Sequence, residues 1–467
     1  MNNKKELFEK APIPKALMAM AVPTVISQLI NLVYNLVDTF FIGRVGNSYM
    51  MAAVTVSFTL FMMTIAFANL FGIGGGSLIA RLIGVGREED AKKVSAFAFY
   101  GAAAIALFYS VVIAVLMRPI LMLLGASEAT IGFAEQYVLL VVVIGGLPII
   151  LSGTCAHLLR NTGYSKQASI GLSGGGILNM ILDPLLMFVV FPSGMEVFAA
   201  ALATMLSNVA SCVYLLVTLQ RVSKEAPVSL SPRMAKTIRR RDRRELFAVG
   251  VPSAVLTGLF DVANIFLNIL MSGHGDLPLA AIGIVMKAER LPNAINLGIC
   301  QGMLPIVAYN YAAKKHDRMR ETIRTARIVG LVISFASMAL FEIFAEPIIR
   351  VFLSTSAGNV TESLQTIAIA VIFLRIRCLS SPVQFWNYNS SYCLQAMGDG
   401  RDTLLHAILR ELVFYIPFMY LLNALAGMYG LAWALLCGEG CGAAVAWFLL
   451  ERFLKKTRQT VSAGARS

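Results

Sequence analysis

A row of polar side chains interrupts the first apolar stretch of the sequence. Its members are spaced by three, four and three residues: Gln28, Asn31, Asn35 and Asp38. These spacings place all four on one face of a helix. Two later apolar stretches carry similar groups, with Asn179 and Asp183 four residues apart in one and Thr204 in the other. A polar face inside an apolar helix contacts other helices or water, so these residues are candidates for binding an ion or a solute.

Asp38 and Asp183 lie deep within these stretches, and the first half of the chain has no Lys or Arg inside an apolar stretch to neutralise them. Desolvation, and mutual repulsion if the two are close, raise the affinity of a carboxylate for a proton or another cation. We therefore expect the two aspartates to bind a cation, either H⁺ or Na⁺, whose movement could be coupled to that of a solute. Asn179 and Thr204 would supply oxygens or hydrogen bonds. The alternative is a structural role, in which each aspartate bonds to the backbone at a helix break such as the one expected near Pro184.

The second half of the chain carries a similar polar row. The two rows align when the sequence is shifted by 229 positions, so that Gln28 corresponds to Thr257 and Asn35 to Asn264. Such duplicated halves are found in many membrane transporters, in which the binding site lies between or within the halves. The candidate cavity residues from both halves are Gln28, Asn31, Tyr34, Asn35, Asp261, Asn264, Met286 and Arg290.

Acidic and basic residues are mixed within the apolar stretches of the second half. They include Glu289, Glu411, Glu439, Arg377 and Arg410. Such charges either pair with one another or contact a substrate, and the sequence leaves both interpretations open.

The elements that position these residues follow from the composition. Of the 467 residues, 57% are hydrophobic and 14% are charged, whereas about 25% of an ordinary soluble domain is charged. This composition excludes a soluble globular enzyme, a disordered chain and a disulfide scaffold. Apolar runs long enough to cross a membrane lie at 16–42, 50–80, 94–117, 134–159, 168–191, 197–220, 246–272, 278–310, 324–345, 364–392, 403–425 and 429–452. We predict an all-α polytopic membrane protein with twelve transmembrane helices.

A hydrophilic, basic segment divides the chain near its middle. We expect an N-terminal lobe of six helices at residues 1–220, a cytoplasmic basic linker at 221–245 and a C-terminal lobe of six helices at 246–467. Lys and Arg concentrate at the termini and in alternate loops, which predicts that both termini face the cytoplasm of a cell membrane. The net charge of +13 therefore indicates membrane topology, and we expect no nucleic-acid partner.

Several segments resemble motifs of the multidrug and toxic compound extrusion (MATE) transporters, in the expected order along almost the whole chain. The last of them is similar to the DinF-like bacterial branch of that family. The segments are Asn35-Leu-Val-Asp-Thr-Phe-Phe-Ile-Gly43, Gly86-Arg-Glu-Glu-Asp-Ala-Lys-Lys93, Asn179-Met-Ile-Leu-Asp-Pro184, Ala200-Ala-Leu-Ala-Thr204 and the stretch from Gln301 to Lys315.

The resemblance implies two pseudo-symmetric six-helix lobes in a V shape and the export of organic, often cationic, compounds driven by inward H⁺ or Na⁺. The ion-site positions of that family fall on Asp38, Asn179, Asp183 and Thr204, with a possible Na⁺ held by the two aspartates. An acidic position of the NorM-like branch falls near Asp261. A second acidic position of that branch is replaced by Ser380-Ser381-Pro382, which favours coupling in the N-terminal lobe.

We therefore predict a secondary active antiporter that exports small amphipathic organic compounds or drugs. The alternative is a flippase for lipid-linked precursors within the same superfamily. An enzyme is not expected, because the four His residues are scattered and no HExxH or Ser-His pair is present. We expect no cofactor beyond the coupling ion, membrane lipids and small molecules as partners, and a monomer.

Overall fold

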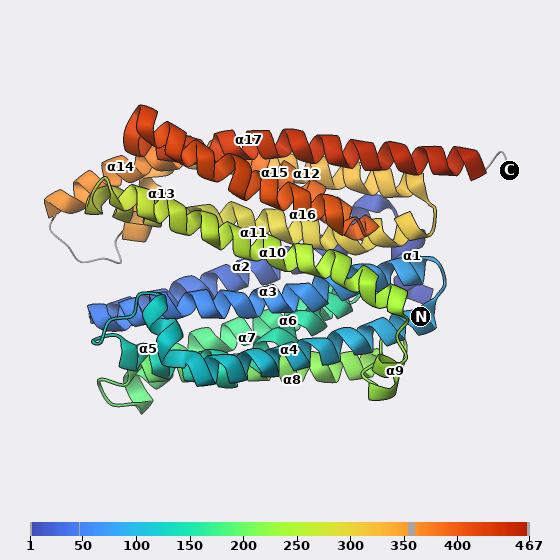
Figure 1. Cartoon of the computed structure of the whole chain (residues 1–467), viewed down its shortest axis with the longest axis horizontal. Coiled ribbons are helices and arrows are strands. Elements are labelled where there is room, and N and C mark those ends of the chain that lie inside the picture. Colours follow the sequence, from blue (N-terminus) through green and yellow to red (C-terminus); the bar gives the residue numbers. More distant parts are fainter. Residues whose placement is uncertain (1, 46, 354–359, 465–467) are drawn as a thin grey trace.

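The computed structural model describes residues 2–45, 47–353 and 360–464, and every regular element in these ranges is a helix (Figure 1). The first part of the chain forms α1 (Asn2–Glu9), α2 (Ile13–Arg44), α3 (Ser48–Gly84), α4 (Glu88–Leu123), α5 (Ile131–Val138), η1 (Leu139–Ile144), α6 (Gly146–Asn161), α7 (Ser165–Leu185), η2 (Leu186–Val190), α8 (Glu196–Val222) and α9 (Pro232–Lys236). The second part forms α10 (Arg240–Ser272), α11 (Asp276–Ala312), α12 (His316–Ile343), α13 (Ala345–Leu353), α14 (Val360–Cys378), α15 (Ser381–Met397), α16 (Gly400–Ile408), η3 (Leu409–Tyr415) and α17 (Ile416–Gly464).

The helices confirm the predicted membrane fold. Among the described residues, 9 helices are long and apolar enough to cross a membrane, and two bent pairs, each with an angle of 46°, bring the number to 11. One of the nine, Gly400–Lys456, is broken at Gly427, where φ is 58° and ψ is −139°. Glycine suits this backbone because it lacks a Cβ. Counting that helix as two spans gives the twelve predicted from the sequence.

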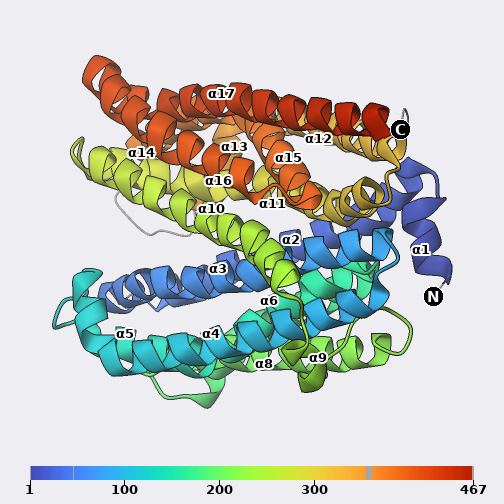
Figure 2. The ribbon, with the colours of Figure 1, turned by 45° about the vertical axis from the view of Figure 1, so that its right-hand side comes forward.

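The spans form two bundles. Helices α2 to α8 make one bundle and α10 to α17 make the other, and α1 and the end of α17 lie at the same end of the molecule (Figure 1). We call this end the terminal end and the opposite one the distal end. The bundles separate toward the distal end, where α3 and α10 diverge (Figure 2).

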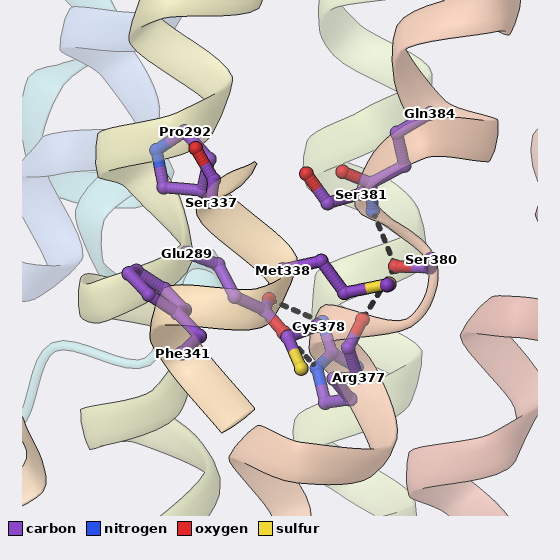
Figure 3. A pocket seen from close by; sticks show the side chains of 10 residues that line it. All are labelled: Glu289, Pro292, Ser337, Met338, Phe341, Arg377, Cys378, Ser380, Ser381 and Gln384. Carbon is purple, nitrogen blue, oxygen red and sulfur yellow. Dashed lines mark hydrogen bonds and ion pairs between the residues drawn. The ribbon is translucent and has the colours of Figure 1, made fainter. Parts of the chain in front are cut away.

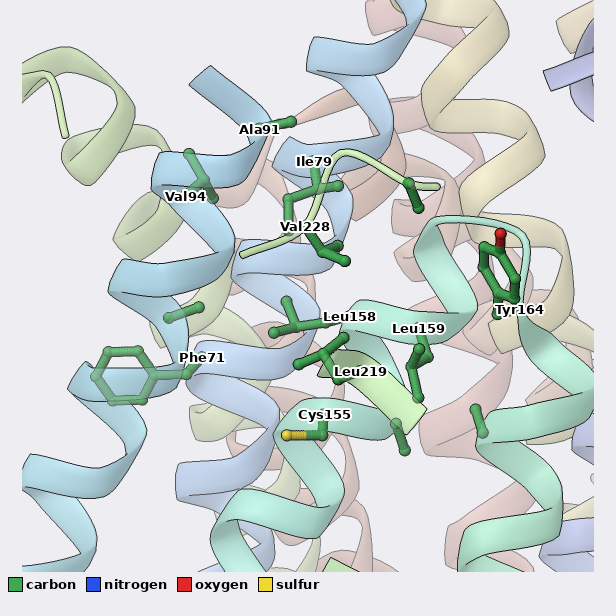
Figure 4. Close-up of a cluster of buried hydrophobic side chains, with 14 of the residues drawn as sticks. Phe71, Ile79, Ala91, Val94, Cys155, Leu158, Leu159, Tyr164, Leu219 and Val228 are labelled. Atoms are coloured by element: carbon green, nitrogen blue, oxygen red, sulfur yellow. The ribbon is translucent and has the colours of Figure 1, made fainter. Parts of the chain in front are cut away.

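Each bundle has its own apolar interior. In the first bundle, buried side chains from α3, α4, α6 and α8 pack together, among them Phe71, Val94, Cys155 and Leu219 (Figure 4). In the second bundle, α10, α11, α13, α14 and α17 contribute a separate cluster. All seven cysteines lie in the described part of the chain and all are free, as expected for small residues in apolar helices.

The two bundles touch closely at the terminal end, where α2 packs on α11 and α3 packs on α10. A Cβ added to Gly302 would collide with Cα of Ala21, so these two helices meet backbone to backbone. The Ser77 hydroxyl donates to the carbonyl oxygen of Gln395 across the same interface at 2.6 Å. An ion pair between Arg81 and Glu245, at 3.4 Å, adds to the contact. The terminal end is therefore closed.

The basic segment between the bundles is partly helical. Residues 240–245 of the expected linker form the first turns of α10, and α9 lies within the remainder. The linker lies along α4, because the Ser229 amide donates to the Ser95 hydroxyl at 2.8 Å and the Tyr100 hydroxyl donates to the Leu230 carbonyl at 3.0 Å. The two bundles are thus joined by a segment held against the surface of the first.

Candidate ion site and substrate cavity

A cavity of about 380 Å³ lies between the two bundles. Its walls come from α2, α3, α10, α11, α15 and η3. Apolar side chains such as Phe58, Met62 and Phe260 alternate with polar ones such as Asn69 and Thr257. This volume and mixed lining are typical of sites for small organic molecules.

Five of the eight predicted cavity residues line this space: Gln28, Asn31, Asn35, Asp261 and Arg290. The other three do not lie among the lining residues. Tyr34 faces α7, where its ring lies beside Gly176. Met286 packs against the apolar core of the second bundle, and Asn264 lies one turn beyond Asp261 on α10.

Gln301 and Tyr392 also line the cavity, although they were not among the predicted cavity residues. Gln301 accepts hydrogen bonds from Gln28 at 3.2 Å and from Arg160 at 3.0 Å, which joins α2 and α6 to α11 at the floor of the cavity. A polar residue within the apolar run 278–310 was the available signal for Gln301. No comparable signal marks Tyr392. Its span is broken between Cys378 and Ser381, so helical spacing along the whole run could not show which way its side chain faces.

The cavity contains charges of both signs. Asp261 and Arg290 face it from α10 and α11, and Arg410 and Glu411 face it from η3. The Arg410 guanidinium makes two contacts with the Glu439 carboxylate, at 2.6 and 3.0 Å. Arg410 therefore forms a buried ion pair and also borders the cavity, so it combines the two roles that the sequence left open.

A second, largely buried ion pair lies outside the cavity. Arg377 donates to both carboxylate oxygens of Glu289 at 2.8 Å, and Ser380 and Ser381 stand beside it at the bend between α14 and α15 (Figure 3). The space around this pair is only about 10 Å³, which is room for about one water molecule. We assign this pair to holding α11 against the broken span.

The four predicted ion-site residues lie together in the first bundle. The Asn179 amide nitrogen donates to Asp183 Oδ1 and to Thr204 Oγ1, each at 3.3 Å, and all three residues are buried. Asp38 on α2 lies close enough for its carboxylate to interact electrostatically with that of Asp183 on α7. Tyr137 of α5 also interacts electrostatically with Asp38, and nothing in the sequence marked it.

Three oxygens of this cluster lack a partner. Among the described residues, Asp38 Oδ1, Asn179 Oδ1 and Asp183 Oδ2 are buried without a hydrogen bond, and neither aspartate forms an ion pair. A buried polar atom left unpaired costs about 1–3 kcal/mol, and more when it carries charge. A proton would remove the charge of one carboxylate, and a hard cation such as Na⁺ would be coordinated by oxygens of this kind.

Comparison with known proteins places the chain in a family. The MatE family model matches residues 23–191 and 252–421. The two ranges begin at Pro23 and Pro252, which are 229 positions apart like the paired residues of the two polar rows. The chain belongs to the MatE family. Its relatives include the multidrug export protein MepA of Staphylococcus saprophyticus, which is 30% identical over 97% of this chain and 96% of its own length. MepA of Staphylococcus aureus strain MSSA476 has the same identity and coverage.

Solved MATE structures share the fold. A crystal structure of MATE in complex with MaL6 has a TM-score of 0.91 at 21% identity and covers 98% of this chain and 100% of its own. An outward-facing multidrug resistance MATE family transporter of the MOP superfamily has a TM-score of 0.88 at 22% identity, with 98% and 99% coverage. Its family, its MepA relatives and its apolar helices make this chain an integral membrane protein of a transporter family and not an enzyme.

Proposed function

We propose that this MATE-family protein is a secondary active antiporter that exports small amphipathic organic compounds in exchange for inward H⁺ or Na⁺. The observation that carries the proposal is the cluster of unpaired buried oxygens on Asp38, Asn179 and Asp183, which has no cationic side chain as partner in the described part of the chain. Empty and charged, such a cluster is unfavourable, whereas binding one cation relieves it.

Helix α2 links the ion site to the cavity. Asp38 lies on the same helix and the same polar face as Gln28, Asn31 and Asn35, which line the cavity. Loading a cation at Asp38 changes the electrostatic balance between α2 and α7, and any resulting shift of α2 moves the cavity wall. Ion entry and solute release thereby share one helix.

The cargo follows from the relatives and from the lining. The MepA relatives are multidrug export proteins, and the cavity has an apolar lining with a few polar groups, which suits varied amphipathic molecules. Flippases for lipid-linked precursors tend to have cationic central cavities. Here Arg290 and Arg410 are matched by Asp261 and Glu411, which favours drug export over lipid flipping.

The proposal also includes the membrane topology, the two lobes and the partners of the protein. We place both termini in the cytoplasm, because Lys and Arg concentrate at the termini and in the alternate loops that lie on the same side of the membrane. Cytoplasmic loops are enriched in these residues. We propose a monomer with two six-helix lobes at 1–220 and 246–467, the 221–245 segment acting as a cytoplasmic linker. Membrane lipids and small solutes, without nucleic acid, are its partners.

The test uses proteoliposomes loaded with a fluorescent amphipathic dye and an imposed H⁺ or Na⁺ gradient. Asp38→Asn and Asp183→Asn each remove one carboxylate charge, so we expect dye binding to persist and gradient-driven export to be lost. The matched control is Asp276→Asn, because Asp276 is exposed at the start of α11 and is not among the residues that line the cavity between the bundles. Wild-type export by both site variants under the same gradient would refute coupling at this site.

Two further arms complete the design. Collapsing one gradient at a time with a selective ionophore identifies the coupling ion. A lipid-scrambling assay on the same vesicles tests the flippase alternative, and scrambling that outlasts the loss of dye export would contradict the antiporter proposal.

A further inference from the structure

A groove of about 510 Å³ opens on the second bundle, away from the cavity between the bundles. It lies between the first half of α12, the middle of α15 and the end of α17, so it belongs to the terminal end of the molecule. Arg320, Arg324, Arg327 and Lys455 line it together with one acidic residue, Glu451. The groove is therefore strongly cationic.

These cationic side chains have no ion-pair partner in the described part of the chain. Arg324 and Lys455 are exposed. Arg327 is fixed against the inner wall, because its Nε donates to Asn389 Oδ1 at 2.9 Å and its guanidinium stacks 4.4 Å from the centre of the Trp386 ring. Its Nη2 atom is buried without a hydrogen-bond partner. The groove thus holds positive charge that an external anion would balance.

The lining changes character along α12. Arg320, Arg324 and Arg327 are four and three residues apart, which places them on one face of the helix. Ile328 and Leu331 continue that face toward the middle of the span. At 1.5 Å per residue, the distance from Arg320 to Leu331 along the helix is about 16 Å. A molecule that fills the groove meets cations at one end and aliphatic side chains at the other.

We propose that this groove binds an anionic phospholipid. Its phosphate lies among Arg320, Arg324 and Lys455, while an acyl chain follows Ile328 and Leu331 along α12. Trp386 stands at the boundary between the two parts, where aromatic rings favour the membrane interface. Basic pockets between membrane helices are suited to anionic headgroups. A free inorganic anion would use the cations and leave the apolar wall without a role.

The experiment measures lipid binding by the purified full-length protein in detergent, with native mass spectrometry as the readout. The probes are phosphatidylglycerol and phosphatidylcholine with identical acyl chains. Each Lys or Arg near a membrane surface strengthens binding of an anionic lipid by about fivefold. The double variant Arg320→Gln/Arg324→Gln should therefore bind phosphatidylglycerol roughly twenty-five-fold more weakly and phosphatidylcholine as the wild type does.

Two matched variants keep the test sharp. Arg233→Gln/Lys236→Gln removes the same charge from α9, whose two cations are exposed and lie outside the groove, and should leave phosphatidylglycerol binding unchanged. Arg320→Lys/Arg324→Lys keeps the charge and should restore binding, which separates loss of the site from misfolding. Equal losses in the α9 variant, or full binding by the Gln variant, would overturn the proposal. Phosphatidylglycerol binding no tighter than the binding of inorganic phosphate would also overturn it, because the acyl chain would then contribute nothing and the groove would be a soluble-anion site.

Discussion

The amide nitrogen of Asn179 lies 3.3 Å from Oδ1 of Asp183, one turn further along α7. The same nitrogen donates to Thr204 on α8, so one side chain connects the acidic residue to the neighbouring helix. The second Asp183 oxygen has no partner in the described part of the chain. The carboxylate is thus held in position on one side and open to a cation on the other.

We expect Asn179→Ala to slow export without unfolding the protein. Losing the amide removes a donor to the charged carboxylate, so a coupling proton should bind more tightly. Na⁺ would instead lose the Asn179 oxygen as a ligand and bind more weakly, and either change should slow turnover. The measurement is dye export against ion concentration in proteoliposomes, in which the variant should half-saturate at a lower concentration of H⁺ or at a higher concentration of Na⁺. An unchanged ion dependence would show that Asn179 does not act on the ion site.

Arg290 and Asp261 should set the charge preference of the cavity in opposite directions. Both line it and neither forms an ion pair within 4.0 Å among the described residues. In water, a unit charge about 4 Å away contributes about 1 kcal/mol, which corresponds to roughly a fivefold change in affinity. We expect Arg290→Met to tighten, and Asp261→Asn to weaken, the binding of a cationic dye measured by fluorescence polarisation. Parallel changes in both variants would argue against an electrostatic effect.

The Arg410–Glu439 pair should matter for stability. Arg410 and Glu439 are both almost completely buried, and removing one partner of such a pair costs about 3–5 kcal/mol. We expect Glu439→Gln to lower the thermal unfolding temperature of the detergent-solubilised protein clearly. The control is Glu346→Gln at the exposed pair with Arg350, because an exposed ion pair contributes only about 0–1 kcal/mol to the free energy of unfolding. Similar unfolding temperatures for the two variants would contradict this expectation.

The close contact at Gly302 should hold the terminal end shut. A valine there would collide with the Ala21 backbone, so Gly302→Val should part the bundles. Ser77, buried at the same interface, can be replaced by cysteine to report this change. We expect maleimide to label Ser77→Cys faster in the Gly302→Val background than beside Gly258→Val, where a Cβ meets nothing within 4 Å. Equal labelling rates would mean that this contact does not control opening.

The helices and their polar faces could be predicted from the sequence because apolar length and helical spacing are local properties. The stripe from Gln28 to Asn35 lies on the cavity as its spacing indicated. Tyr34 does not, because it is one residue from Asn35 and one residue rotates a helix by about 100°. That rotation turns its ring toward α7.

Other parts of the site depend on contacts between distant segments. Met286 and Arg290 are one turn apart on α11, yet Arg290 reaches the cavity while Met286 packs into the second bundle. Spacing alone could not separate them, because both lie on the same side of the helix. Tyr392 reaches the cavity from α15 only because the span bends by 46° between Cys378 and Ser381, and that angle is set by packing.

The turn at Gly427 exposes little polypeptide at the distal end of the molecule. The last two spans change direction there, and no polar loop separates them. Two other distal connections are also brief, from Val190 to Glu196 and from Ser272 to Asp276, whereas residues 124–130 between α4 and α5 form a longer one. Proteases cut most readily at exposed loop tips, so the brief connections offer few cleavage sites to a protease and only a small epitope to an antibody. A binder that enters between the bundles at this end would obstruct the exit path of a solute.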